Sequence, residues 1–97
     1  MLTRIVRMTF DENHIDDFLA MFAENKEKIG GFSGCQQLTL MKDADKPEVY
    51  ITYSIWESKE ALEAYRHSDL FKGVWAKTKK WFADKPFAFS AQEVKPF

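Results

Sequence analysis

The sequence predicts an α+β fold whose strands and helices follow the order β-α-β-β-α-β. Two observations support this prediction: four short segments are rich in β-branched and aromatic residues, and two longer segments carry apolar residues at helical spacing. Turn-forming residues separate these segments, notably Gly30-Gly31, Pro47 and residues 84–86. This order is that of a split β-α-β unit, in which both helices cover one face of an antiparallel sheet.

The first half of the chain predicts a strand, a helix and a second strand. Residues 2–10 alternate imperfectly between apolar and polar side chains, as a half-buried strand does. Asp11 is placed to cap a helix that ends at Gly30-Gly31, where glycine adopts a left-handed conformation at little cost. Residues 35–41 predict the second strand. The apolar face of the helix consists of Ile15, Phe18, Leu19, Phe22 and Ile29.

The second half predicts a hairpin strand, a broken helix and a last strand. Residues 49–56 follow a polar turn and are β-branched and aromatic, which suits a strand. Ser58 is a natural N-cap for a short helix, and Ser68 can cap a second helical segment that runs to about residue 83. Residues 87–94 predict the fourth strand.

The whole chain, residues 1–97, predicts one domain of ferredoxin-like topology with a four-stranded antiparallel sheet. A domain of this size buries only about two thirds of the surface that its unfolded chain exposes. Yet 15% of its residues are aromatic, and strand 49–56 carries apolar side chains on both faces. A second copy packed against the sheet would cover the face opposite the helices, so we expect a homodimer.

The composition argues against several partners and locations. The net charge of −1 gives no electrostatic basis for binding nucleic acid or an anionic membrane. The N-terminus has no apolar run long enough for a signal peptide or a membrane span. The single Cys35 cannot form an internal disulfide and suits a reducing compartment. We therefore expect a soluble cytoplasmic protein with neither a nucleic acid nor a membrane as partner.

Three motifs follow one another in the sequence: G-F-x-G at residues 31–34, W-x-S-x-E-A-L-x-x-Y at 56–65 and H-S-x-x-F at 67–71. With the residues around them, GFSGCQQLTL and YITYSIWESKEALEAYRHSDLFKGVW, they resemble the antibiotic biosynthesis monooxygenase (ABM) domain family of small dimeric α+β barrels. The resemblance covers nearly the whole chain and implies this dimeric barrel. It also implies one of several activities, because family members include cofactor-free oxygenases, haem-degrading enzymes, aldehyde-handling proteins and proteins of no known activity.

Among these activities, we expect a cofactor-independent monooxygenase of a small aromatic or quinol-like substrate, bound between the helices and the sheet. In such a reaction the deprotonated substrate reduces dioxygen, and the protein supplies an apolar pocket, a general base and hydrogen bonds to the substrate oxygens. His67 lies at the joint between the two helical pieces, and its unperturbed pKa of about 6.5 suits a base. The expected catalytic residues are His67 and Tyr65, and the expected substrate-binding residues are Trp56, Trp75, Arg4 and Phe71.

Each of these residues has a role in the expected site. Tyr65 holds a substrate oxygen by a hydrogen bond, the two tryptophans form aromatic walls, and Arg4 or Arg7, which lie on opposite faces of the first strand, steadies an anion. No cofactor and no metal are expected, because the spacing of His, Cys and carboxylate residues resembles no metal site. The sequence also contains no Gly-rich phosphate loop, nucleophile elbow, or flavin or nicotinamide motif.

Other interpretations stay open. His67 can simply end a helix, and Phe71 and Trp75 at helical spacing suit a core. The same pocket can serve a non-catalytic small-molecule-binding dimer, or the aromatic residues can fill it in a purely structural dimer. The haem-degrading branch fits less well: it uses an asparagine, a tryptophan and a histidine at places that the resemblance assigns to Val6, Tyr65 and Trp75.

Overall fold

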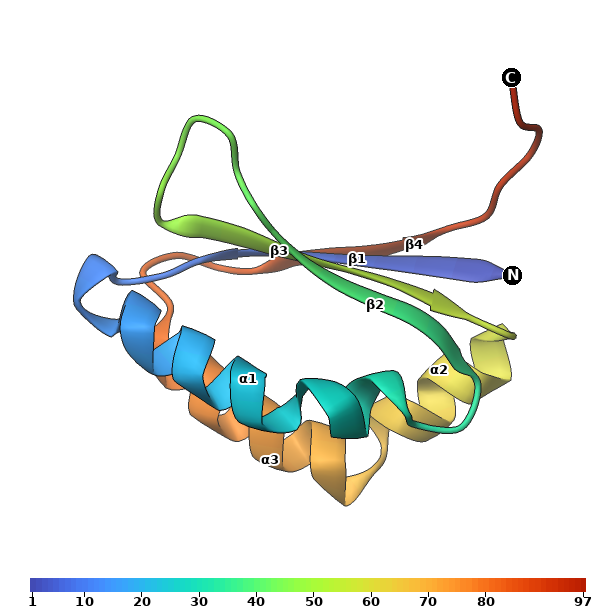
Figure 1. The fold of residues 1–97 in the computed structure, drawn as a ribbon, viewed down its shortest axis with the longest axis horizontal. Helices are drawn as coiled ribbons and strands as arrows, with labels where there is room; N and C mark the ends of the chain where they lie inside the picture. Colours follow the sequence, from blue (N-terminus) through green and yellow to red (C-terminus); the bar gives the residue numbers. More distant parts are fainter.

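The structure is a computed structural model that describes all 97 residues (Figure 1). Its four strands form one antiparallel sheet in the order β2-β3-β1-β4, and the helices lie together on one face of it. The predicted α+β ferredoxin-like fold is therefore confirmed. The elements are β1 (Leu2–Thr9), η1 (Glu12–His14), α1 (Ile15–Gly30), β2 (Cys35–Lys42), β3 (Val49–Trp56), α2 (Lys59–Arg66), α3 (Asp69–Thr78), η2 (Lys79–Trp81) and β4 (Phe87–Ala91).

The two predicted serine caps are present. The Ser58 hydroxyl accepts a hydrogen bond from the backbone amide of Ala61 at 3.1 Å, and the Ser68 hydroxyl accepts one from that of Phe71 at 3.1 Å. Each cap satisfies an amide that has no partner inside its helix. The caps split the helical segment into α2 and α3, with the joint between Arg66 and Asp69.

Several predicted boundaries are wrong. Asp11 caps the 3₁₀ turn η1, where its carboxylate accepts from the amide of Asn13 at 2.9 Å, and α1 starts only at Ile15. The last strand ends at Ala91 rather than at residue 94, because β1 is its only partner and their pairing runs out at Thr3. The second helical segment leaves α-helical geometry after Thr78 and finishes as η2.

The left-handed glycine lies elsewhere than expected. Gly31 ends α1 with φ of −90°, whereas the one glycine with positive φ is Gly34, at +89°. A β-carbon on Gly34 would also come within 2.5 Å of the Ala61 side chain. The G-F-x-G motif therefore uses its second glycine to bring the start of β2 close against α2.

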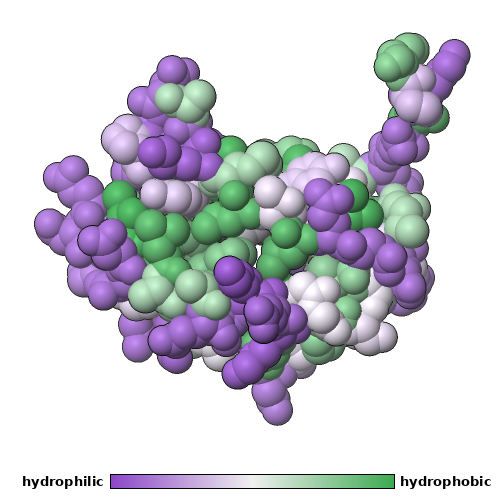
Figure 2. All heavy atoms as spheres, in the orientation of Figure 1, coloured by the Kyte–Doolittle hydropathy of each residue, from purple (hydrophilic) through white to green (hydrophobic).

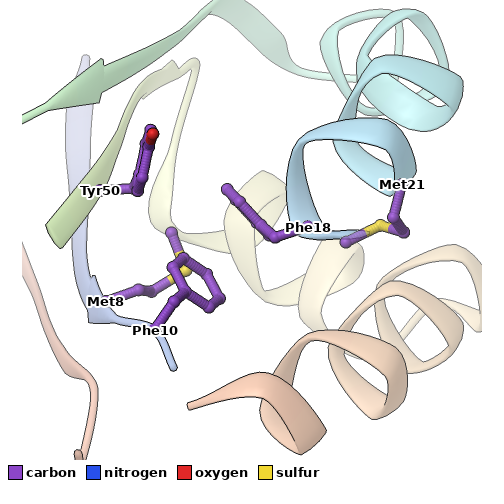
Figure 3. Packing of buried hydrophobic residues seen from close by; sticks show 5 residues of the cluster. All are labelled: Met8, Phe10, Phe18, Met21 and Tyr50. Atoms are coloured by element: carbon purple, nitrogen blue, oxygen red, sulfur yellow. The ribbon is translucent and has the colours of Figure 1, made fainter. Parts of the chain in front are cut away.

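The core lies between the sheet and the helices in two separate clusters. The first consists of Met8, Phe10, Phe18, Met21 and Tyr50, whose side chains meet between β1, β3 and α1 (Figure 3). In it the rings of Phe10 and Phe18 stack with their centroids 4.2 Å apart. The second cluster consists of Leu2, Trp56 and Leu62.

The opposite face of the sheet carries no helix (Figure 1). The strand pairing places residues of β2, β3, β1 and β4 side by side in rows across this face. One row consists of Thr39, Tyr53, Ile5 and Phe89, and a neighbouring row consists of Met41, Ile51, Arg7 and Phe87. Met41, Phe87 and Phe89 are exposed large hydrophobic residues. The expected homodimer stays a prediction, and this face is where we place its interface. No helix has both the length and the apolar character to cross a membrane.

Candidate functional site

A cavity of about 300 Å³ lies between the sheet and the helices. Fourteen of its twenty lining residues are hydrophobic, so the cavity suits an apolar ligand. Figure 2 shows hydrophobic residues gathered across the middle of the molecule, where its surface is hollowed. The cavity touches members of both core clusters. Its floor is formed by alternate residues of two strands, Arg4, Val6 and Met8 of β1 and Thr52, Ser54 and Trp56 of β3, because alternate side chains share one face of a strand.

Four predicted aromatic residues form one continuous wall of this cavity. The ring of Trp56 stacks on that of Tyr65 with centroids 5.0 Å apart. The ring of Phe71 meets Tyr65 edge to face at 5.2 Å and stacks on Trp75 at 5.9 Å. Tyr65 comes from the last turn of α2 and Phe71 from the first turn of α3, so the Ser68 cap between the helices brings them together.

Tyr65 presents a neutral hydroxyl. Burial of its ring raises the pKa of Tyr65 to about 12, and the nearby Cys35 thiol adds to the effect. The phenol is therefore protonated near neutral pH and acts as a hydrogen-bond donor rather than as a base. The hydroxyl makes no hydrogen bond within the chain, and Tyr65 lines the cavity. It is available to a ligand.

Ser54 is a second donor, which the sequence analysis missed. The indole N–H of Trp56 donates to the Ser54 hydroxyl oxygen at 2.9 Å, and both residues are buried. Because the oxygen accepts this bond, the hydroxyl proton can point elsewhere, and Ser54 lines the cavity. The signal was present in the sequence, since Ser54 lies two residues before Trp56 and so shares its face of the strand.

Two arginines lie at the same end of the cavity. Arg4 donates to the Ser90 hydroxyl at 3.1 Å, and Arg66 forms an ion pair of 2.9 Å with Glu63. Partial burial and the positive charge of Arg66 lower the pKa of Arg4, while the charge of Glu63 raises it. Arg66 was not predicted as a site residue. It lies four residues after Leu62, however, so the two side chains share one face of the helix and both point toward the cavity.

His67 is not brought to the cavity. It follows the last residue of α2, its side chain is 77% exposed, and its Nε2 atom lies 3.5 Å from a carboxylate oxygen of Glu63. Residues four apart lie on one helical face, so the side chain of His67 lies on the same face as that of Glu63 and not on the face of Tyr65. The expectation that His67 faces the substrate is corrected. Of the six predicted site residues, the structure gathers Tyr65, Trp56, Trp75, Arg4 and Phe71 around the cavity.

The cavity does not fit a haem iron. Val6, Tyr65 and Trp75, at the places of the haem-degrading residues, all line it, and no histidine or cysteine does. The raised pKa of Tyr65 keeps its phenol neutral, which disfavours ligation as a tyrosinate. Elsewhere, too, no three His, Cys, Asp or Glu side chains are grouped where they could hold a metal ion.

Comparison with known proteins gives one family and many similar folds. The family model described as "Antibiotic biosynthesis monooxygenase" matches residues 1–77. No curated protein sequence matches significantly. Among solved structures, an antibiotic biosynthesis monooxygenase superposes with a TM-score of 0.91 at 19% identity, over 98% of this chain and 100% of that one.

Two further structures show how widely this fold occurs. Rv0793 from Mycobacterium tuberculosis superposes with a TM-score of 0.89 at 15% identity, over 98% of this chain and 96% of its own. A conserved protein from Methanosarcina mazei superposes with a TM-score of 0.89 at 15% identity, over 96% of this chain and 93% of its own. At such identities the likeness establishes the fold and leaves the chemistry to be argued from the cavity.

Proposed function

The chain belongs to the antibiotic biosynthesis monooxygenase family, and on this premise we propose that it oxygenates a small electron-rich aromatic substrate, a phenol or hydroquinone, in its cavity. The observation that carries the proposal is the pairing of an aromatic wall with hydroxyl donors at one end. Phe71 and Trp75 offer apolar surface to a flat ring, and the buried Trp56 supports this wall by stacking on Tyr65. Tyr65 and Ser54 offer donors to the oxygen of the ring. Such a site orients a ring by its polar end.

The size of the cavity supports a substrate of about two fused rings. An engineered apolar cavity of about 150 Å³ binds benzene. The cavity here is about twice as large, at about 300 Å³, and one end of it is polar. A naphthol or naphthohydroquinone is therefore a better fit than a single ring.

The proposed reaction balances without an added reductant. A phenol with a hydrogen on its para carbon and one dioxygen molecule give a quinone and one water. The phenolate gives an electron to dioxygen, the resulting superoxide joins that para carbon, and loss of water from this peroxide leaves the second carbonyl. In a hydroquinone the para carbon already carries oxygen, so the superoxide joins an ortho carbon that carries hydrogen, and loss of water gives a hydroxyquinone. The substrate loses four electrons and dioxygen gains four, so one oxygen atom enters the product and the other leaves as water.

The chain's own groups favour the phenolate. Hydrogen bonds from Tyr65 and Ser54 stabilise an anionic oxygen more than a neutral one, and thus lower the pKa of the bound phenol. The Trp56 indole holds the Ser54 oxygen in place for this bond. No carboxylate or imidazole lines the cavity, so in this proposal the phenol proton leaves to solvent rather than to a side chain.

The same lack of a base among the lining residues favours a second candidate, a non-catalytic dimer that binds small aromatic molecules. Oxygen uptake separates the two. We expect uptake with naphthols and naphthohydroquinones, in the presence of a metal chelator and above the rate without protein. Tight binding of these compounds with no uptake above the blank would favour the binding dimer and reject the oxygenase.

We further propose that the protein works as a homodimer joined through the uncovered sheet face. Exposed Met41, Phe87 and Phe89 lie on this face beside Ile5 and Tyr53. An apolar sheet face without a helical layer is stabilised by packing against a second sheet.

A further inference from the structure

We infer that the cavity selects aromatic substrates that carry one carboxylate besides the oxidisable hydroxyl, and that Arg4 and Arg66 hold this carboxylate. The inference rests on the proposed function in taking the cavity as the substrate site. It goes beyond that function in assigning a charge to the substrate and two residues to its recognition.

The first step is the balance of charge at the polar end. Arg4 and Arg66 are the only charged residues that line the cavity, and both are cationic. Arg66 is paired with Glu63, but Arg4 has only the neutral Ser90 hydroxyl as a partner and forms no ion pair. The two arginines and Glu63 together leave one positive charge without a counterion. One ligand carboxylate would neutralise it.

The second step is the position of these charges. Arg4 lies directly opposite Ser54 in the pairing of β1 with β3, and Arg66 lines the same cavity as Tyr65. The two cations therefore share the cavity with the two hydroxyl donors that we assign to the phenol oxygen. A carboxylate on a ring carbon near the hydroxyl would lie at the arginines, with the rings against the aromatic wall.

The third step is the strength of the interaction. A guanidinium presents parallel N–H donors that match a carboxylate, and such charged hydrogen bonds are stronger than neutral ones. Arg4 is partly buried, and the apolar lining weakens the screening by water. Burial and the neighbouring positive charge of Arg66 together lower the pKa of Arg4.

Binding of three ligands of one shape tests the inference: 2-naphthoate, its neutral amide and the cationic 2-naphthylmethylammonium. We expect calorimetry to show 2-naphthoate binding about tenfold or more tighter than the amide, from one charged hydrogen-bonding contact, and the cation binding most weakly. Equal affinity for naphthoate and amide would overturn the inference. None of the three has a hydroxyl to oxidise, so binding is measured apart from turnover.

Variants assign the preference to the arginines. Arg4→Gln should abolish most of the preference for naphthoate, whereas Arg4→Lys should keep part of it. Arg66→Gln should weaken the binding of naphthoate. The double variant Arg66→Gln with Glu63→Gln should restore this binding in part, because the ion pair is then removed with no change in net charge. Lys72→Gln removes an exposed positive charge on α3 and should change nothing. If both Arg4→Gln and Arg66→Gln still preferred naphthoate over the amide, the assignment of carboxylate binding to these arginines would be refuted.

The outcomes for charge and for catalysis are separable. If naphthoate is preferred but no hydroxynaphthoate consumes oxygen, the oxygenase proposal fails and the charge selection holds. If neutral naphthols are oxygenated as efficiently as hydroxynaphthoates, the charge selection fails and the oxygenase proposal holds.

Discussion

The indole N–H of Trp56 donates a hydrogen bond to the hydroxyl oxygen of Ser54 over 2.9 Å, inside the protein and beside the cavity. These two residues lie two apart on β3 and face the helices together. The bond satisfies a buried indole and also orients a serine hydroxyl toward the space where we place the substrate oxygen. Stability and activity are thus linked at one contact.

Ser54→Ala should destabilise the protein by about 1 to 3 kcal/mol, because it leaves the buried indole N–H of Trp56 without a partner. Urea unfolding measures this change. The double variant, Trp56→Phe with Ser54→Ala, should lose less free energy of unfolding than the sum of the losses in the two single variants. The reason is that the second change no longer breaks a hydrogen bond. Strict additivity in this double-mutant cycle would show that the contact contributes nothing.

Tyr65→Phe should lower kcat for a naphthol by about 10²- to 10³-fold, the effect of losing one oriented donor to an oxyanion. Stability should change by less than about 0.5 kcal/mol, because the hydroxyl has no hydrogen-bond partner within the chain. Oxygen uptake and thermal unfolding provide the two measurements. An unchanged rate would remove Tyr65 from the site.

The raised pKa of Tyr65 predicts a loss of stability at high pH. The pKa is about 12 in the folded protein and 10.0 for a free tyrosine, so the folded state holds its proton more tightly. Stability is then unaffected below about pH 10 and falls as the pH rises toward 12, in total by about 2 kcal/mol. Unfolding of the wild type and of Tyr65→Phe between pH 8 and pH 11.5 should diverge above about pH 10. Parallel profiles would contradict the assignment.

His67→Ala should leave the rate of oxygen uptake within about twofold of the wild type, because the side chain is exposed and outside the cavity. A general base would instead account for a loss of about 10²- to 10⁴-fold. The loss of its contact with Glu63 should cost less than about 1 kcal/mol of stability. A hundredfold loss of rate in a folded variant would restore His67 as the base.

Sedimentation should give twice the chain mass of 11.4 kDa at micromolar concentration. Phe89→Glu should shift the equilibrium toward monomer, because it places a charge among the exposed apolar side chains of the proposed interface. Lys59→Glu, an exposed change on α2, serves as the control and should remain dimeric. A wild-type monomer would contradict the proposed interface.

The order of elements could be predicted from the sequence, because short-range physics decides it. Ser58 and Ser68 cap the helices where they were expected to, and alternation along β1 and β3 places Arg4 and Trp56 on the side of the helices. Capping depends on three or four neighbouring residues, and strand alternation depends on two. Even so, the end of β4 was missed, since it depends on where its partner strand stops.

The site needed the tertiary structure. Each step along a helix turns a side chain by about 100°, so the difference between Arg66 in the cavity and His67 in solvent is a single position at a helix end. The opposition of Arg4 to Ser54 depends on sheet register. Whether aromatic side chains fill a cavity or line one depends on how closely two layers pack, a distance set by every residue between them and by no local pattern.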